Sequence, residues 1–96
     1  MLERDIEAYF RRRVEAEGGL ALKFVSPSHR GVSDRIVCFP GSTWFVELKR
    51  PGGRLSPLQR VFAAEMARLG QNYTCLSNKE EIDEWLMNGL TPKKKL

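Results

Sequence analysis

Two carboxylates and one amine, Asp34, Glu47 and Lys49, are the residues of this sequence whose types and spacing favour chemistry. They belong to two β-rich runs, 34–39 and 43–48, which a short turn containing proline and glycine separates. Such a turn between β-branched and aromatic runs indicates a hairpin. Side chains alternate along a strand, so Glu47 and Lys49 share one face, and antiparallel pairing brings Asp34 across from them on that face. The sequence therefore predicts that three charged groups converge at one end of an apolar hairpin.

Paired carboxylates on neighbouring strands provide the oxygen ligands that a hard cation such as Mg²⁺ prefers, and Mn²⁺ accepts the same donors. An amine two residues along the same face would hold an attacking water or stabilise charge that develops on phosphorus. Four basic residues nearby are expected to meet a phosphate backbone: Arg30, Arg35, Arg50 and Arg54. Together these groups predict a metal-dependent phosphodiesterase site. The alternative for Glu47 and Lys49 alone is an exposed ion pair on a half-solvated strand, because a Glu-x-Lys triplet is common by chance.

The elements around this hairpin are predicted from periodicity and from their end signals. Apolar residues at helical spacing predict a first helix from Leu2 to about Glu17, and residues 20–26 alternate enough to predict a strand. Ser56-Pro57 begins a second helix, with Gln59 at the capping-box position.

A further strand at 71–77 and a short helix follow, with Ser77 or Asn78 as the N-cap. The order αβββαβα places a helix between the third and fourth strands, which predicts a parallel crossover. The expected fold is α/β, a mixed sheet flanked by helices.

The composition is that of an ordinary globular chain, with 42% hydrophobic and 29% charged residues among 96. We expect one domain, residues 1–90, and a mobile basic tail, residues 91–96. The net charge of +4 and the pI near 9.4 favour a polyanionic partner. No apolar run approaches a membrane span and the N-terminus lacks a signal-peptide core, so we expect no membrane partner and a cytoplasmic protein. Cys38 and Cys75 are not accompanied by the further cysteines or histidines that a metal site needs, which predicts two buried thiols.

Three stretches around the hairpin resemble a known family. They are Gly31-Val32-Ser33-Asp34, then Val46-Glu47-Leu48-Lys49, then the segment PGGRLSPLQ, residues 51–59. In combination they resemble the VRR-NUC domain of the PD-(D/E)XK nuclease superfamily, which has the restriction-endonuclease-like fold. The similarity runs from Glu3 to about Leu86 and is to the small stand-alone versions of phages and bacteria. One departure is Ser33, where the family has proline, a mild change because proline there mainly stiffens the approach to the strand.

The resemblance implies a role for each matching residue. Asp34 and Glu47 would be metal ligands, together with the backbone carbonyl of Leu48. Lys49 would position or activate the water. Gln59 would lie near the active site, and its alternative role as partner of the helix N-cap does not exclude this.

The first helix of the family contributes a further glutamate, and two residues are candidates for it. Glu3 fits the family spacing better, while Glu7 lies one turn further along the same helix face. The alternative for either residue is a solvated helix charge.

For the whole chain, the resemblance implies a magnesium-dependent DNA endonuclease in a bacterial or phage-infected cell. Small members of the family suggest branched DNA, such as four-way (Holliday) junctions, as substrate and a homodimer as the active form. A rival from another class is a non-cleaving DNA-binding or protein-interaction module on the same fold. Clustered carboxylates count against the rival, because a mere binder gains nothing from groups that repel phosphate.

Overall fold

The computed structural model describes residues 3–89, with side chains for residues 4–88. Its elements are α1 (Glu3–Ala16), β1 (Leu20–Lys23), β2 (Arg35–Phe39), β3 (Ser42–Leu48), α2 (Pro57–Arg68), β4 (Asn72–Leu76), α3 (Lys79–Glu84) and a π-helical turn, η1 (Trp85–Gly89). The order αβββαβα agrees with the prediction. The expected tail, 91–96, lies outside the described residues.

The four strands form one mixed sheet in the order β1-β2-β3-β4. The pairs β1–β2 and β2–β3 are antiparallel, and β3–β4 is parallel, as the helical crossover between them requires. The predicted hairpin is confirmed, because Phe39 pairs with Ser42 across a turn made of Pro40 and Gly41. Gly41 has a φ of 83°, a backbone conformation that glycine adopts without steric cost.

The first strand is shorter than the predicted range 20–26. Its last ladder bond runs from the N–H of Phe24 to the carbonyl of Asp34, over 2.9 Å. Because β2 begins directly after Asp34, no ladder partner remains for the next residues, and Val25 is exposed. The strand therefore ends where its neighbour begins.

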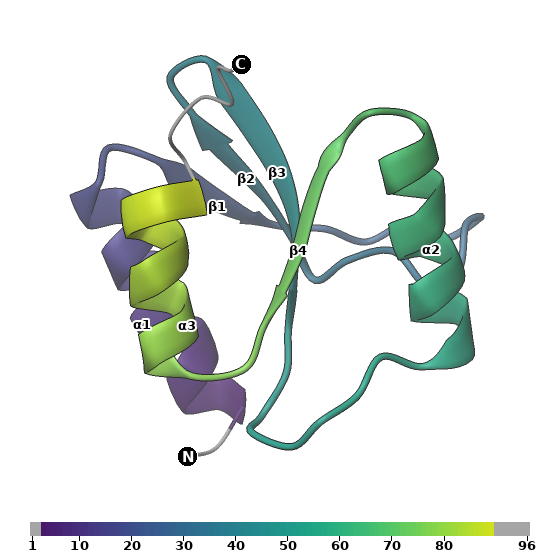
Figure 1. Cartoon of the computed structure of the whole chain (residues 1–96), viewed down its shortest axis with the longest axis horizontal. Helices are drawn as coiled ribbons and strands as arrows, with labels where there is room; N and C mark the ends of the chain where they lie inside the picture. Colours follow the sequence, from purple (N-terminus) through teal and green to yellow (C-terminus); the bar gives the residue numbers. More distant parts are fainter. Residues whose placement is uncertain (1–2, 90–96) are drawn as a thin grey trace.

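Helices cover both faces of the sheet, with α1 and α3 side by side on one face and α2 on the other (Figure 1). The main core lies under α1 and α3 and contains Ile6, Phe10, Val14, Val37, Trp44, Val46, Leu48, Ile82, Trp85 and Leu86. The ring of Trp85 stacks on Phe10, with 5.7 Å between centroids, and meets Trp44 edge-on at 5.5 Å. It also meets Phe39 edge-on at 6.0 Å. This cluster of aromatic rings thus supports β2 and β3 on the face of the sheet that α1 and α3 cover.

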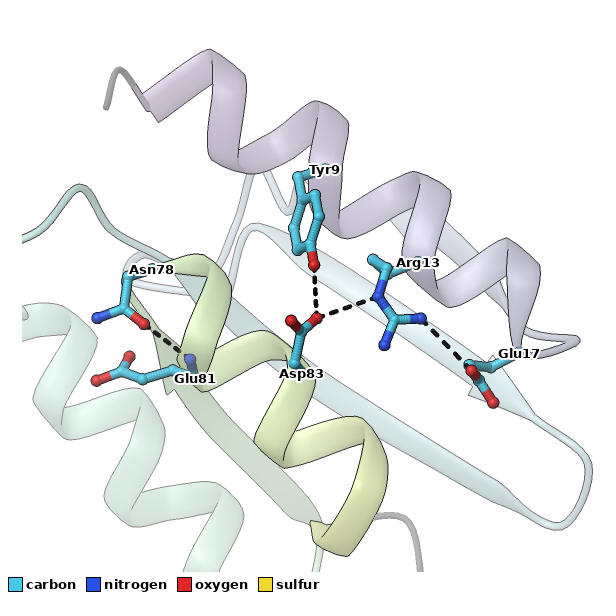
Figure 2. Close-up of polar contacts among 6 residues, drawn as sticks. All are labelled: Tyr9, Arg13, Glu17, Asn78, Glu81 and Asp83. Atoms are coloured by element: carbon cyan, nitrogen blue, oxygen red, sulfur yellow. Dashed lines mark hydrogen bonds and ion pairs between the residues drawn. The ribbon is translucent and has the colours of Figure 1, made fainter.

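A polar cluster joins α1 to α3 at the surface of this layer (Figure 2). The hydroxyl of Tyr9 donates to Asp83 Oδ1 over 2.6 Å, and Arg13 Nε donates to the same oxygen over 3.1 Å. The hydrogen bond from Tyr9, assisted by Arg13, lowers the pKa of Asp83 and keeps it ionised. Asn78 is the N-cap of α3, since its side chain accepts from the N–H of Glu81 over 2.7 Å.

The second helix begins with the predicted capping box. The N–H of Gln59 donates to Ser56 Oγ over 3.2 Å, and the N–H of Ser56 donates to Gln59 Oε1 over 2.8 Å. Phe62 is the buried residue of α2, and its ring meets Phe45 of β3 at 5.9 Å and Tyr73 of β4 at 6.0 Å. This contact seats α2 on the sheet and brings Gln59 towards the end of β3.

Both cysteines are free thiols on strands. Cys38 is half-buried, but Cys75 is exposed, so the prediction of two buried thiols is wrong for Cys75. The reason is topological, because β4 is an edge strand of the sheet. Within residues 3–89, none of the helices has the length and apolar character needed to cross a membrane.

Candidate active site

The two carboxylates predicted to converge do face each other across the hairpin. Arg35 pairs with Val46, so the preceding residue, Asp34, lies opposite the following one, Glu47. Both point to the α2 side of the sheet, because they alternate with the two buried residues of that pair. The site is therefore built by β2 and β3 at the end of the hairpin away from its turn.

Asp34 is fixed by a backbone donor. Its Oδ2 accepts from the N–H of Leu48 over 2.9 Å. The carbonyl of Leu48 points to the same side of β3 as its N–H, since both groups of a strand residue face one neighbour. The predicted third ligand, this carbonyl, is thus on the Asp34 side of the strand.

Two contacts fix the loop before Asp34, one at Ser33 and one at Gly31. Ser33 is 1% exposed and its hydroxyl donates to the carbonyl of Arg35 over 3.1 Å. Gly31 has a φ of 81°, and a Cβ there would lie 2.4 Å from the carbonyl oxygen of Leu58 in the first turn of α2. Ser33 therefore stiffens the approach to the strand with a hydrogen bond, in the position where proline would do so with its ring.

Glu47 is the buried charge of the site, with 2% of its side chain exposed. Its Oε2 accepts from Gln59 Nε2 over 3.1 Å and lies 3.5 Å from Lys49 Nζ. Its Oε1 is buried and has no hydrogen-bond partner within the described part of the chain. Burial first, and the charge of Asp34 second, raise the pKa of Glu47 from 4.5 to about 7, although Lys49 acts in the opposite direction.

Gln59 makes both of the contacts that the sequence left open. Its Oε1 closes the capping box with the N–H of Ser56, and its Nε2 donates to Glu47. One amide side chain thus joins the start of α2 to the buried carboxylate.

Two of the candidate residues, Glu7 and Arg35, do not lie beside Asp34 and Glu47. Glu7 Oε1 is 3.6 Å from Arg35 NH2, and Arg35 is 8% exposed on the α1 side of the sheet. This pair is therefore on the face opposite to Asp34 and Glu47. The expected DNA contact of Arg35 does not agree with this position, because a buried, paired guanidinium is not available to a phosphate. The side chain of Glu3 lies outside the described residues.

The other predicted DNA-binding residues, Arg30, Arg50 and Arg54, are exposed. Arg50 directly follows Lys49, and Arg54 ends the glycine-containing turn in the connection to α2, where the N–H of Gly53 donates to the carbonyl of Arg50. These three arginines remain accessible to a large anionic partner.

Two neighbours of Glu47 on β4 were not predicted. The parallel register places Cys75 opposite Glu47 and Tyr73 opposite Phe45, on the same face. Burial, followed by the charge of Glu47, raises the pKa of Tyr73. The sequence indicated that β3 and β4 are parallel, but only the register between them would have identified these residues.

The site agrees with a hard divalent cation as ligand. Among the described residues, no three Asp, Glu, His or Cys side chains form a metal-binding group, so a cation here would have the two carboxylates and the predicted carbonyl of Leu48 as its protein donors. Mg²⁺ is commonly held by one or two carboxylates, with waters and substrate phosphates completing its shell. The buried, unpaired Oε1 of Glu47 and the raised pKa of that carboxyl are the features that a bound cation would compensate.

Comparisons with known proteins agree with this geometry. No family model matches the sequence. The chain is 40% identical over 79 residues to a protein named "Putative nuclease p44" from Acyrthosiphon pisum secondary endosymbiont phage 1, a match that covers 81% of this chain and 85% of the relative. A solved structure described as "VRR_NUC domain" superposes with a TM-score of 0.85 at 27% identity and covers 90% of this chain and 95% of its own. The mixed sheet in the order αβββαβα is thus the PD-(D/E)XK fold, and the chain belongs to the VRR-NUC family.

Proposed function

We propose that this protein is a metal-dependent endonuclease that hydrolyses phosphodiester bonds in DNA, with Mg²⁺ as its cofactor and Mn²⁺ able to replace it. The observation that carries the proposal is the position of Asp34 opposite Glu47 on one face, one residue beyond the pair of Arg35 and Val46, with the ammonium group of Lys49 3.5 Å from Glu47. The name of the phage relative, a nuclease, supports the same class of reaction.

Each residue of the site has a distinct task in this reaction. Asp34 and Glu47 would hold the cation together with the carbonyl of Leu48. When bound, the cation would supply positive charge to the phosphate and lower the pKa of a coordinated water. Lys49 orients the attacking water and stabilises negative charge on the phosphate oxygens as it develops. Gln59 keeps the carboxylate of Glu47 in place through its Nε2.

The third carboxylate of the site is proposed to be Glu3. Glu7, the other candidate, is already paired with Arg35 on the opposite face of the sheet. That pair has a structural task, because it neutralises a guanidinium that is 8% exposed.

Gln59→Glu tests the task of Gln59 without removing its cap. Glutamate retains the acceptor for the N–H of Ser56, but it loses the donor to Glu47 and adds a second negative charge beside it. We expect DNA cleavage to slow about 10- to 100-fold, as for other partners of metal ligands. Single-turnover cleavage of labelled DNA measures the change.

Ser56→Ala is the matched control. It removes the hydroxyl that accepts from the N–H of Gln59 but leaves the amide of Gln59 opposite Glu47. We expect a loss of about 1 kcal/mol in the free energy of unfolding and an unchanged cleavage rate. Equal cleavage rates for Gln59→Glu and the wild type would show that Gln59 only caps α2.

Arg50 and Arg54 are proposed to hold the DNA backbone next to the site. For Arg50→Ala/Arg54→Ala, we expect the slope of log K against log[salt] to fall by about 1.8, because each lost phosphate contact removes about 0.9. Binding to unrelated DNA sequences should weaken equally, since phosphate contacts carry no sequence information. Fluorescence anisotropy at several salt concentrations measures both effects. Arg11→Ala/Arg12→Ala, which removes two exposed arginines of α1, is the control, and an equal fall in its slope would contradict a local role.

The proposed substrate is branched DNA, such as a four-way junction, and the proposed active form is a homodimer. A symmetric pair of sites is suited to two cuts related by a two-fold axis. Self-association is supported by exposed apolar side chains on β1 and on and beside α2: Leu20, Leu22, Leu58, Val61 and Leu69. Large exposed apolar groups on a small protein favour burial against a partner.

Cleavage of labelled duplex, flap, four-way junction and single-stranded DNA tests the function, with Mg²⁺, Mn²⁺ or EDTA in separate reactions. We expect metal-dependent cuts at symmetric positions of the junction, and light scattering should give the mass of a dimer. Equal cutting of all substrates would still support the nuclease reaction but would exclude a preference for junctions. DNA binding without cleavage under any of these conditions would instead support the non-cleaving module.

A further inference from the structure

Two buried polar atoms on the α2 side of the sheet have no hydrogen-bond partner among the described residues. One is Oε1 of Glu47 and the other is the hydroxyl of Tyr73. The first is an acceptor and the second is a donor, so one water molecule between them would satisfy both. An unpaired buried group costs free energy, and two complementary ones in the same region of a protein need an explanation.

Tyr73 and Glu47 are close neighbours in the sheet. Phe45 pairs with Tyr73 and Glu47 pairs with Cys75 in the parallel register of β3 and β4. Tyr73 is therefore the diagonal neighbour of Glu47 on the same face, a separation that a long aromatic side chain can span. Phe62 of α2 packs against the ring of Tyr73, with 6.0 Å between centroids, and restricts where the hydroxyl can move.

A phenolic hydroxyl has a pKa of about 10, so the hydroxyl of Tyr73 carries its proton at neutral pH. It is therefore a permanent donor on the same face of the sheet as the carboxylates.

The two oxygens of Glu47 are held unequally. Gln59 and Lys49 both approach Oε2, whereas Oε1 accepts no hydrogen bond within residues 4–88. A carboxylate that is held through only one oxygen can still turn about its terminal torsion, which is broad for glutamate. A donor at Oε1 would fix the plane of the group.

We propose that Tyr73 is a positioning residue for Glu47, whose hydroxyl donates to Oε1 through one water molecule. It fixes the orientation in which the carboxylate receives the cation. The inference rests on the proposed function for its metal but not for this bridge, which requires no metal. Partners of metal-binding carboxylates typically change metal affinity about 10- to 100-fold.

The contact is tested first without metal, by urea unfolding of four proteins in EDTA. They are the wild type, Tyr73→Phe, Glu47→Met and the double variant. Phenylalanine keeps the ring against Phe62, and methionine removes both oxygens of Glu47 at similar volume. We expect Tyr73→Phe to lower the unfolding midpoint of the wild type and to leave that of Glu47→Met unchanged or higher. An equal shift in both backgrounds would overturn the proposal, because the hydroxyl would then be independent of Glu47.

The consequence for the metal is tested by calorimetric titration of Mn²⁺ into the protein without DNA. We expect Tyr73→Phe to bind Mn²⁺ about 10-fold more weakly than the wild type. Tyr9→Phe is the matched control, because its hydroxyl serves Asp83 on the α1–α3 side, and it should bind as the wild type does. Equal affinities of Tyr73→Phe and the wild type would overturn the positioning role. A wild type that binds no Mn²⁺ would instead refute the proposed function, and the unfolding experiment would then decide on the contact alone.

Discussion

Asp34→Asn is expected to reduce metal-dependent DNA cleavage by about 10³-fold or more. Such a loss corresponds to about 4 kcal/mol of transition-state stabilisation, the scale on which a cation acts at a phosphoryl group. Asparagine retains an oxygen that accepts from the N–H of Leu48, so the loop before β2 should keep its position. The variant therefore removes the charge of a proposed ligand and little else. Single-turnover cleavage in Mg²⁺ measures the loss, and calorimetry with Mn²⁺ should show weaker binding of the cation.

Asp83→Asn is the matched control for this substitution. Asp83 belongs to the cluster between α1 and α3, where asparagine can still accept from the hydroxyl of Tyr9. We expect full cleavage activity and a slightly lower stability. Cleavage by Asp34→Asn at the wild-type rate, with the same need for metal, would place the reaction elsewhere in the protein.

Glu47→Gln is expected to abolish cleavage and, at the same time, to stabilise the metal-free protein. The pKa of Glu47 is about 7 in the folded state and 4.5 in its ordinary environment. Between these values the folded state binds the proton and the unfolded state does not, so the stability of the wild type falls as pH rises through this window. Glutamine has no charge and avoids this loss. We expect its free energy of unfolding at about pH 8 to exceed that of the wild type by about 1–3 kcal/mol, because one pKa unit is worth about 1.36 kcal/mol.

Urea unfolding in EDTA at about pH 8 and about pH 3 measures the effect, and the gain should be absent at the lower pH, where both states of the wild type bind nearly the same number of protons. Glu80→Gln, at an exposed position of α3, provides the control and should change stability little at either pH. A Glu47→Gln protein that is less stable than the wild type at the higher pH would mean that Gln59 and Lys49 stabilise the charge more than burial destabilises it.

Local chemistry accounts for the parts of the site that the sequence predicted. The hairpin follows from a turn that needs a positive φ at Gly41, and the shared face of Asp34 and Glu47 follows from alternation along paired strands. The start of α2 follows from its capping box. In each case the information lies within a few residues or within one pair of strands.

The unpredicted parts depend on contacts between segments distant in sequence. Tyr73 lies beside Glu47 only because of the register between β3 and β4, which no local pattern sets. The position of Arg35 could have been predicted from the sequence, because Arg35 follows Asp34 and alternation along the strand places the two side chains on opposite faces. The charge of Arg35 suggested a contact with DNA, but Glu7 of α1 pairs with this charge inside the protein.

The contacts of Trp85 also determine when the site can form during synthesis of the chain. Its ring closes the cluster formed by Phe10, Phe39 and Trp44, so the core behind β2 and β3 is incomplete until residue 85 has been added to the growing chain. A nascent chain that ends before this residue carries Asp34 and Glu47 on a hairpin without its hydrophobic support, and isolated hairpins are at best marginally stable in water. The two carboxylates therefore reach their final separation only after residue 85 is free to pack against the hairpin.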